Sequence, residues 1–204
     1  MFSERKSEKE AFKKPPFFIS YLITDPKEYG DTIEVFEKKF IQALTSHKVD
    51  IVCFRDKTTP NTQELIKSFK TIAKEFKIDK IIINNDIEQA LNIQLDGIHL
   101  TSQQFNTIPY AKQKNLYTII SCHNEKEVQD AKQKGADAIT YSPIFYKEDK
   151  ESPKGCENLQ KIVKKYQNRD FQIIALGGII SQKQVTQIQN TNCAGFASIR
   201  YFTN

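Results

Sequence analysis

Charged side chains follow several of the short apolar runs of this chain, where a binding site could be built. Arg55 and Lys57 come after the run IVCF, two positions apart. Side chains at i and i+2 of a strand share a face, so both cations can reach one anion. Arg offers a bidentate fork and Lys a point charge, which suits phosphate or pyrophosphate. The plainer alternative is a solvated loop pair bridged to Asp56.

A glycine pair, Gly177 and Gly178, follows the run QIIAL and precedes a helix start at Ser181. Glycine lets the backbone approach a ligand closely, and a helix N-terminus attracts phosphate. Backbone amides at Ile199 and Arg200, after the last apolar run, would complete such a cradle. We therefore predict that these four residues bind phosphate, although any tight turn also uses glycines.

One histidine stands at the end of a predicted strand, immediately before a predicted helix. Histidine side chains ordinarily change charge near neutral pH, which suits proton transfer, and we predict that His123 is catalytic. The alternative is a histidine that is simply hydrogen-bonded to a loop. Ser121, two residues earlier, is assigned to substrate binding. We expect His99 to be packed inside a strand and His47 to be exposed at a helix end.

A carboxylate at the end of another run raises the question of a metal ion. Asn85 and Asp86 follow the run KIIIN, and Mg²⁺ usually takes one or two carboxylates plus substrate phosphates. The next such loop reads Thr101–Gln104 and offers no second carboxylate. We therefore predict no metal site and no cofactor. Asn85, Asp86 and Lys150 are assigned to substrate binding.

Strands and helices alternate along the chain, as apolar runs give way to segments of helical period. The predicted strands are Phe17–Thr24, Asp50–Phe54, Lys80–Asn84, Gly97–Leu100, Tyr117–Ser121, Ala138–Tyr141, Gln172–Leu176 and Gly195–Ile199. The predicted helices are Thr32–Ser46, Thr62–Phe76, Ile87–Leu91, Gln103–Ala111, Glu125–Lys134, Glu157–Tyr166 and Ser181–Asn190. Eight such steps predict a compact (β/α)₈ TIM barrel, with an open doubly wound sheet as the alternative.

Both ends of the chain depart from a regular barrel. Residues 1–16 form a charged extension before the barrel domain at 17–204, and too few residues follow the last strand for a full closing helix. The extension or a partner subunit could cover the surface that a full closing helix would bury, so a homo-oligomer is one possible assembly. Cys53, Cys122, Cys156 and Cys193 show no C-x-x-C pairing and are expected to be reduced and buried.

Composition excludes several classes of protein. The net charge is +5, but 30 basic residues are interleaved with 25 acidic ones, so no nucleic-acid partner is expected. No apolar stretch is long enough to cross a membrane, so no membrane association is expected. The N-terminus lacks the apolar segment of a signal peptide, which predicts a cytoplasmic protein. A small anionic substrate is the natural use of local positive charge.

Taken in order, the motifs resemble the thiamine-phosphate synthase and thiazole tautomerase (TenI-like) superfamily. They are YLITD (21–25), NND (84–86), DGIHL (96–100), SCHNEKE (121–127), GADAITYSPIF (135–145), ALGGI (175–179) and GFASIR (195–200). The resemblance covers nearly the whole chain from Phe18. It implies a barrel enzyme of thiamine biosynthesis that binds a phosphorylated thiazole, with the phosphate at Gly178 and the amides of Ile199 and Arg200.

The chain departs from the synthase pattern at three loops. It keeps Arg55 and Lys57 but has Cys53 where synthases have Gln, and Thr101–Gln104 replaces a Gly-Gln pair followed by acidic residues. In the sixth loop a Thr-x-Thr-Lys pattern is replaced by 147–150, of which only Lys150 matches. These losses should weaken the binding of a diphosphate and of Mg²⁺.

Three hypotheses follow from the resemblance and its departures. The favoured one is a cofactor-free thiazole tautomerase, an isomerase in which His123 shifts a proton to give the aromatic thiazole carboxylate phosphate. The second is a divergent thiamine-phosphate synthase, a transferase that joins thiazole phosphate to hydroxymethylpyrimidine diphosphate, releases pyrophosphate and holds Mg²⁺ with Asp86. The third is a non-catalytic regulatory protein that binds thiazole phosphate.

Overall fold

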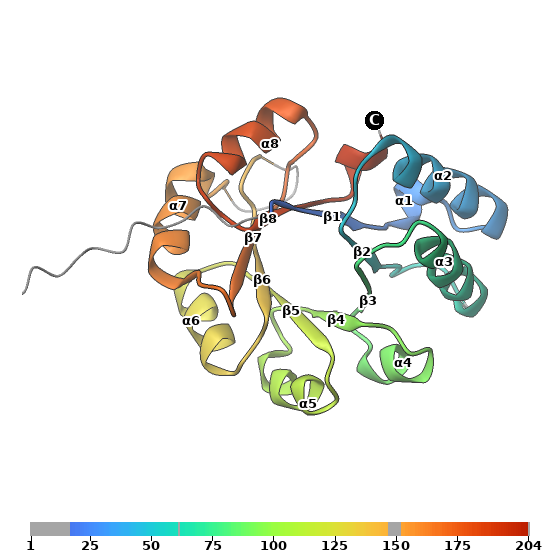
Figure 1. Ribbon diagram of the computed structural model, residues 1–204, viewed down its shortest axis with the longest axis horizontal. Coiled ribbons are helices and arrows are strands. Elements are labelled where there is room, and N and C mark those ends of the chain that lie inside the picture. The colour runs from blue at the N-terminus through green and yellow to red at the C-terminus, as the bar shows by residue number, and fades with distance from the viewer. Residues whose placement is uncertain (1–16, 61, 147–151, 204) are drawn as a thin grey trace, which may run out of the picture.

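The strands of this protein pair in chain order until the last returns to the first. In the computed structural model, which describes residues 17–60, 62–146 and 152–203, all eight strands are parallel and form a closed barrel (Figure 1). Closure is set by the register between the first and last strands, in which Ile19 pairs with Gly195 and Leu22 with Ser198. The predicted (β/α)₈ fold is confirmed. The extension at 1–16 lies outside the described residues, so the predicted domain boundary stays a prediction.

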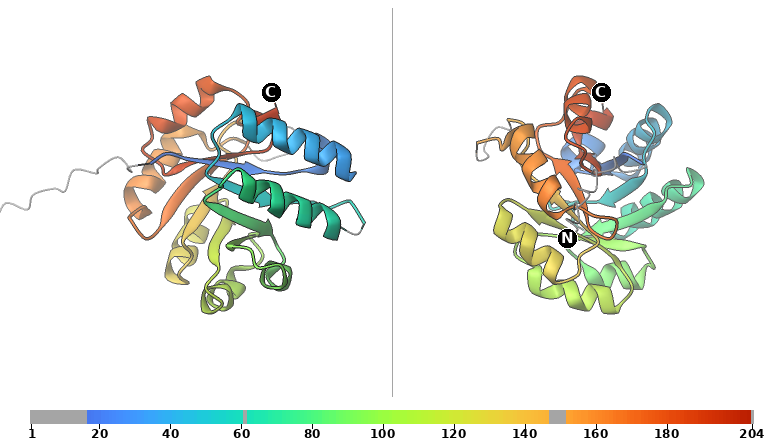
Figure 2. Two further views of the ribbon diagram at one scale, coloured as in Figure 1. Left: turned by 45° about the vertical axis from the view of Figure 1, so that its right-hand side comes forward. Right: turned by 60° about the vertical axis from the view of Figure 1, so that its left-hand side comes forward.

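Helices surround the ring of strands on its outer side, as two further views show (Figure 2). The strands are β1 (Ile19–Ile23), β2 (Ile51–Phe54), β3 (Lys80–Asn84), β4 (Gly97–Leu100), β5 (Tyr117–Cys122), β6 (Ala138–Tyr141), β7 (Gln172–Leu176) and β8 (Gly195–Ser198). The α-helices are α1 (Pro26–Tyr29), α2 (Ile33–Ser46), α3 (Gln63–Glu75), α4 (Ile87–Asn92), α5 (Ile108–Gln113), α6 (Glu125–Gln133), α7 (Gly155–Tyr166) and α8 (Gln182–Gln189). Two short 3₁₀ helices, η1 (Phe105–Thr107) and η2 (Arg200–Thr203), complete the set.

Two apolar layers hold the barrel together, one inside the ring of strands and one between strands and helices. The inner layer is small and contains Tyr21, Ile23, Ile51, Cys53, Ile82, Ile119, Ala138, Ile174 and Ala197. The outer layer is larger and includes a cluster of rings in which Phe40 stacks on Phe69 at 5.0 Å and Phe54 meets Phe69 edge-on at 5.5 Å. Burial on both faces explains why the strands read as continuous apolar runs.

Carboxylates at the N-terminal end of the barrel fix the starts of three strands. Asp50, Asp96 and Asp137 each precede an even-numbered strand and accept a hydrogen bond from a backbone N–H of the strand before. Asp137 also accepts two hydrogen bonds from the Lys112 ammonium, at 2.7 and 2.6 Å. Residues at this end of such barrels serve stability, so these carboxylates tie neighbouring strands in register.

The position of an eighth helix is filled by η2, which packs against α2 near the C-terminus (Figure 1). The expectation of a shortened last helix is therefore confirmed. The expectation of an exposed His47 is wrong, because its ring packs against Tyr201 and Phe202 at 5.3 and 5.6 Å between centroids. The helix end that carries His47 is covered by this aromatic turn, which the sequence alone did not place there.

Some element boundaries differ from the prediction for local reasons. Helix α1 was not predicted, although Asp25 caps it and Pro26 occupies its first turn, a combination that starts helices. The predicted helix 103–111 is instead a 3₁₀ turn followed by α5. The first strand begins only at Ile19, and Phe17 before it is exposed.

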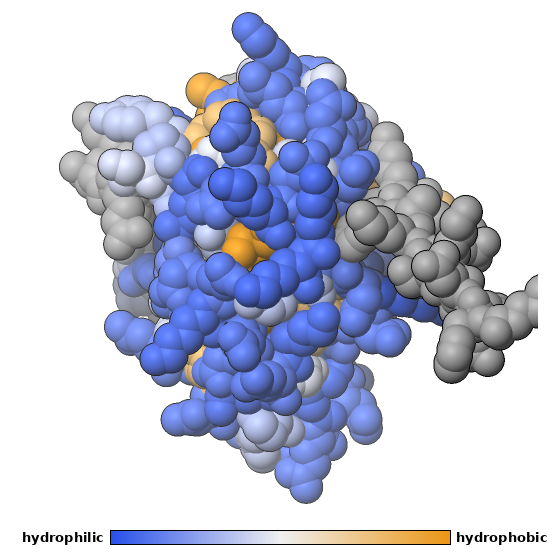
Figure 3. Space-filling model, turned by 90° about the vertical axis from the view of Figure 1, so that its left-hand side faces the viewer, coloured by the Kyte–Doolittle hydropathy of each residue, from blue (hydrophilic) through white to orange (hydrophobic). Residues whose placement is uncertain are grey.

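The four cysteines are free, as expected, but only three of them are buried. Cys53, Cys122 and Cys193 are buried, whereas Cys156 is half-buried. The face shown in Figure 3 is mostly hydrophilic with small, separated hydrophobic spots. None of the helices in the described ranges has the length and apolarity to cross a membrane.

Candidate functional site

The glycine pair after β7 is held in a conformation and a packing that only glycine fits. Gly177 and Gly178 have φ of +99° and +72°, in the left-handed region. A Cβ on Gly177 would lie 2.8 Å from the Cα of Pro143, and one on Gly178 would lie 2.5 Å from the carbonyl oxygen of Tyr146. The loop after β6 therefore rests directly on this turn. Backbone hydrogen bonds from Ile144 and residue 145 to β7 and its turn hold the contact.

Side chains around this turn donate hydrogen bonds to its carbonyl groups, whereas nearby backbone amides stay available to a ligand. Gln184 donates to the carbonyl of Gly178 at 2.8 Å, and Ser198 donates to the carbonyl of Ile179 at 2.7 Å. Within the described residues, the backbone N–H groups of Gly178, Ile199 and Arg200 donate no hydrogen bond. These amides come from two neighbouring strand ends beside the capped N-terminus of α8, an arrangement that suits an anion; we call them the cradle, and the binding of phosphate there stays a prediction.

The imidazole of His123 is turned toward the loop that packs on this cradle. Its Nδ1 lies 3.2 Å from the carbonyl oxygen and 3.3 Å from the hydroxyl of Ser142. Ser142 precedes Pro143, which touches Gly177, so the ring lies on the cradle side of the barrel mouth. A carbonyl accepts only, so when Nδ1 carries the ring proton it donates to Ser142, and Nε2 then keeps a lone pair for proton transfer. The backbone N–H of His123 donates to Glu127 at 2.6 Å, which fixes the residue where α6 begins.

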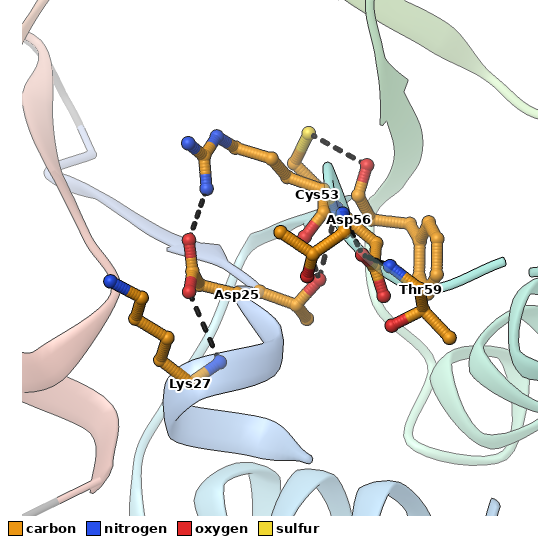
Figure 4. Close-up of polar contacts among 9 residues, drawn as sticks. Asp25, Lys27, Cys53, Asp56 and Thr59 are labelled. Atoms are coloured by element: carbon orange, nitrogen blue, oxygen red, sulfur yellow. Dashed lines mark hydrogen bonds and ion pairs between the residues drawn. The ribbon is translucent and has the colours of Figure 1, made fainter. Parts of the chain in front are cut away.

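The predicted anion-binding pair is only partly assembled. The Arg55 guanidinium forms an ion pair with Asp25, at the end of β1 (Figure 4). Lys57 is exposed in the loop beyond. The alternative of a bridge to Asp56 is wrong, because that carboxylate accepts from the backbone N–H groups of Thr58 and Thr59. Burial raises the pKa of Asp56, but the hydrogen bonds from Thr59 and Thr58 outweigh it and the net shift is downward.

The residues after β3 and β4 fit Mg²⁺ only if substrate phosphates provide most of its ligands. Asp86 is exposed, and one of its oxygens caps α4 by accepting from the N–H of Gln89. Gln104 bridges the two loops, because its side chain accepts from Thr101 and donates to the carbonyl of Asn85. No group of three or more His, Cys, Asp or Glu side chains suited to a metal occurs in the described ranges. Among the described residues after β3 and β4, Asp86 offers one carboxylate oxygen to a phosphate-bound ion.

Ser121 is half-buried and bonded into the barrel interior. Its hydroxyl lies 3.0 Å from Nε2 of His99, which confirms that His99 is a packed residue. Lys150 lies outside the described residues, so its assignment stays a prediction. The structure thus brings His123 and the cradle to one side of the mouth, and Arg55 and Asp86 to the ends of β2 and β3.

Two residues at the mouth were missed as site residues. Asp25 neutralises Arg55, and the Asp-Pro pair at 25–26 was the available signal for a helix cap at this loop. Ser142 fixes the His123 ring from 19 positions away, and no local pattern announces such a contact.

Comparisons of the sequence with known proteins agree on one family, and a solved structure shares the fold. The family model described as thiamine monophosphate synthase matches residues 20–202. A putative thiamine-phosphate synthase 2 of Aquifex aeolicus is 30% identical over 89% of this chain and 96% of its own. A thiamine-phosphate synthase of Latilactobacillus sakei is 32% identical over 90% of this chain and 84% of its own. The solved structure of a thiamine phosphate pyrophosphorylase from Pyrococcus furiosus superposes with a TM-score of 0.76 at 24% identity, covering 89% of this chain and 85% of that one.

Proposed function

This chain belongs to the thiamine monophosphate synthase family, and on that premise we propose that it is an enzyme of thiamine biosynthesis that forms thiamine phosphate. The reaction joins a phosphorylated thiazole to a pyrimidine diphosphate and releases pyrophosphate. The names of both curated relatives favour this reaction over the thiazole tautomerase favoured by the loop sequences. The observation that carries the proposal is the amide cradle after β7 and β8, which suits the monophosphate that the reaction requires.

The amides and the charged groups at the mouth have roles in this reaction. The amides of Gly178, Ile199 and Arg200 hold the thiazole phosphate. Arg55 stabilises the negative charge of the departing pyrophosphate, because a guanidinium binds two phosphate oxygens at once. A phosphate-bound Mg²⁺, held in part by Asp86, would add positive charge at the leaving group when bound. Lys57 and Lys150 are assigned to the same anion.

A proton shift on the thiazole carboxylate phosphate is the second candidate. The specific observation in its favour is His123, whose Nδ1 lies 3.2 Å from the carbonyl oxygen of Ser142; with the ring proton on Nδ1, Nε2 has a free lone pair. The lack of a second carboxylate in the Thr101–Gln104 loop also favours a reaction without a metal ion. General acid–base catalysis by such a group contributes typically about 10²–10⁴-fold to a rate.

Two assays on the purified full chain separate these candidates. The first follows thiamine phosphate formed from thiazole phosphate and pyrimidine diphosphate, with and without EDTA, and the second follows aromatisation of the thiazole carboxylate phosphate. The proposal expects EDTA-sensitive coupling that falls in Arg55→Gln and survives in His123→Gln. Aromatisation lost in His123→Gln, with no coupling by the unaltered chain, would replace it by the second candidate. Binding of thiazole phosphate without turnover in either assay would instead indicate a regulatory protein.

A further inference from the structure

The interior of the barrel contains a line of hydrogen-bonded polar side chains, Tyr21, His99 and Ser121, which the proposed reaction does not use. His99 on β4 is 3% exposed, yet its ring contacts polar groups from three other strands. Nδ1 lies 2.8 Å from the hydroxyl of Tyr21 on β1, and Nε2 lies 3.0 Å from Ser121 on β5 and 3.3 Å from Thr140 on β6. The imidazole therefore spans the barrel below the mouth, inside a layer that is otherwise mainly aliphatic.

The charge state of His99 limits how its protons are distributed. Burial, and secondarily the positive charge of Arg55, lower the pKa of His99 to about 4. The ring is therefore neutral near pH 7, with one N–H donor and one lone pair. Two arrangements remain: the proton is on Nε2 and points to Ser121, or it is on Nδ1 and points to Tyr21.

The surroundings of Tyr21 decide between the two arrangements. Tyr21 is fully buried, and burial followed by the proximity of Cys53 raises the pKa of its phenol, which therefore keeps its proton. That proton needs an acceptor, since buried donors without one are costly. The alternative to His99 is the sulfur of Cys53, a weak acceptor whose own S–H faces the carbonyl of Phe54 at 3.7 Å. Tyr21 thus donates to Nδ1, and the ring proton lies on Nε2.

The consequence reaches the mouth through Ser121. With its proton on Nε2, His99 donates to the Ser121 oxygen, and Thr140 approaches the same oxygen at 3.5 Å. Among the described residues, the Ser121 hydroxyl makes no other hydrogen bond. Ser121 is half-buried, near the C-terminal end of β5. Its own proton is the one left to point outward.

We propose that Tyr21 and His99 are positioning residues that form a one-way line of hydrogen bonds and turn the Ser121 hydroxyl proton toward the ligand at the mouth. The ligand must then present an acceptor atom, an oxygen or ring nitrogen of the phosphorylated heterocycle. This last point rests on the proposed function, whereas the direction of the line does not.

Ring-nitrogen NMR on ¹⁵N-histidine-labelled protein tests the line without any ligand. The chain has three histidines, so His47→Gln and His123→Gln variants assign the signals. At pH 7 we expect His99 to be neutral, protonated on Nε2, with a hydrogen-bonded lone pair on Nδ1. In Tyr21→Phe the Nδ1 signal should shift toward that of a free lone pair. A proton on Nδ1, or a charged ring, overturns the line.

Measuring the affinity for thiazole phosphate tests whether the line turns the Ser121 hydroxyl proton toward the ligand. Tyr21→Phe should weaken binding about three- to tenfold, because Ser121 is then free to turn its proton inward. The matched control is Tyr117→Phe, whose hydroxyl donates to Gln172 at 2.9 Å at the other end of β5 and which should leave affinity unchanged. In a Ser121→Ala background, Tyr21→Phe should have no further effect. An equal loss in both backgrounds means that Tyr21 acts structurally and overturns the proposal.

The two readouts also separate this inference from the proposed function. If the unaltered chain fails to bind thiazole phosphate, the proposed function is wrong, and the proton position on His99 still decides the line. If binding occurs but the ring proton lies on Nδ1, the function stands and the line is wrong.

Discussion

The most exacting prediction concerns one methyl group at Gly178. The change Gly178→Ala places a Cβ 2.5 Å from the carbonyl oxygen of Tyr146 and 2.7 Å from that of Phe145, at a φ of +72°. Both contacts are with backbone, so no side-chain rotation relieves them. Either the turn, which carries part of the cradle, or the loop after β6, which packs on it, must move.

The expected loss of stability is a sum of two costs. A non-glycine residue in the left-handed region costs about 1–2 kcal/mol, and overpacking against fixed atoms costs about 1–3 kcal/mol more. Alanine restricts the unfolded chain and returns about 0.4–1 kcal/mol. Gly135→Ala isolates the first cost, because Gly135 has a φ of +85° and no atom lies within 4 Å of its added Cβ. The difference between the two variants should therefore be about 1–3 kcal/mol.

Urea unfolding followed by circular dichroism gives this difference, and calorimetry gives the affinity of each variant for thiazole phosphate. We expect Gly178→Ala to lose both stability and affinity, and Gly135→Ala to lose a little stability and no affinity. Equal losses of stability in the two variants would refute the packing of the loop on the turn. Unchanged affinity in Gly178→Ala would refute the assignment of the cradle.

Three further predictions concern charges. Because the pKa of His99 is about 4 in the folded chain against an ordinary 6.5, only the unfolded chain binds a proton at this residue between these two pH values. The contribution of His99 to the free energy of unfolding is therefore full above pH 6.5 and is lost as the pH falls toward 4. Urea unfolding should show a slope of up to about 1.4 kcal/mol per pH unit from His99 in this range, and His99→Gln should lack it. Asp137→Ala removes hydrogen bonds from Thr118 and Lys112 and should cost about 2–3 kcal/mol, whereas Asp137→Asn should cost less; equal shifts in melting temperature would contradict this. Asp25→Ser keeps a residue that can cap α1 but removes the ion pair with Arg55. Calorimetry should then show that pyrophosphate binds about three- to tenfold more tightly, whereas an unchanged affinity would mean that Arg55 does not face the anion.

The fold could be predicted because its information is local and repeated. Each strand is an apolar run buried on both faces, as at Ile81–Ile83, and each long helix carries a single apolar stripe, as in α3. Caps such as Asn124 and Ser181 also lie where their residue types indicate. Eight repetitions leave little choice of topology, since parallel strands with helical connections close in one order.

The site was less predictable because its contacts cross between loops. The position of Arg55 depends on Asp25, which lies 30 residues away, and the His123 ring depends on Ser142, which lies 19 away. His47 was misjudged for the same reason, as its cover comes from the C-terminal turn. Strand order tells which loops are neighbours, but the partner of a long side chain within that ring of loops depends on packing that no sequence window contains.

The cradle is made of backbone amides, whereas the rest of the mouth is made of side chains. Membership of the family therefore predicts the cradle, but the side chains decide which reaction follows. The cradle consists of backbone amides set by two glycines and by strand ends, so a chain that keeps the fold and those glycines keeps the cradle that we propose for phosphate. Binding of a diphosphate and a metal ion depends on side chains instead, at Cys53 and in the Thr101–Gln104 loop, where this chain departs from the synthase pattern. Grafting a Gly-Gln-acidic sequence into that loop should therefore raise EDTA-sensitive coupling without altering affinity for thiazole phosphate. If the graft changes affinity for thiazole phosphate and leaves coupling unchanged, the amide cradle and the side chains assigned to the diphosphate do not act independently, and their separate roles are refuted.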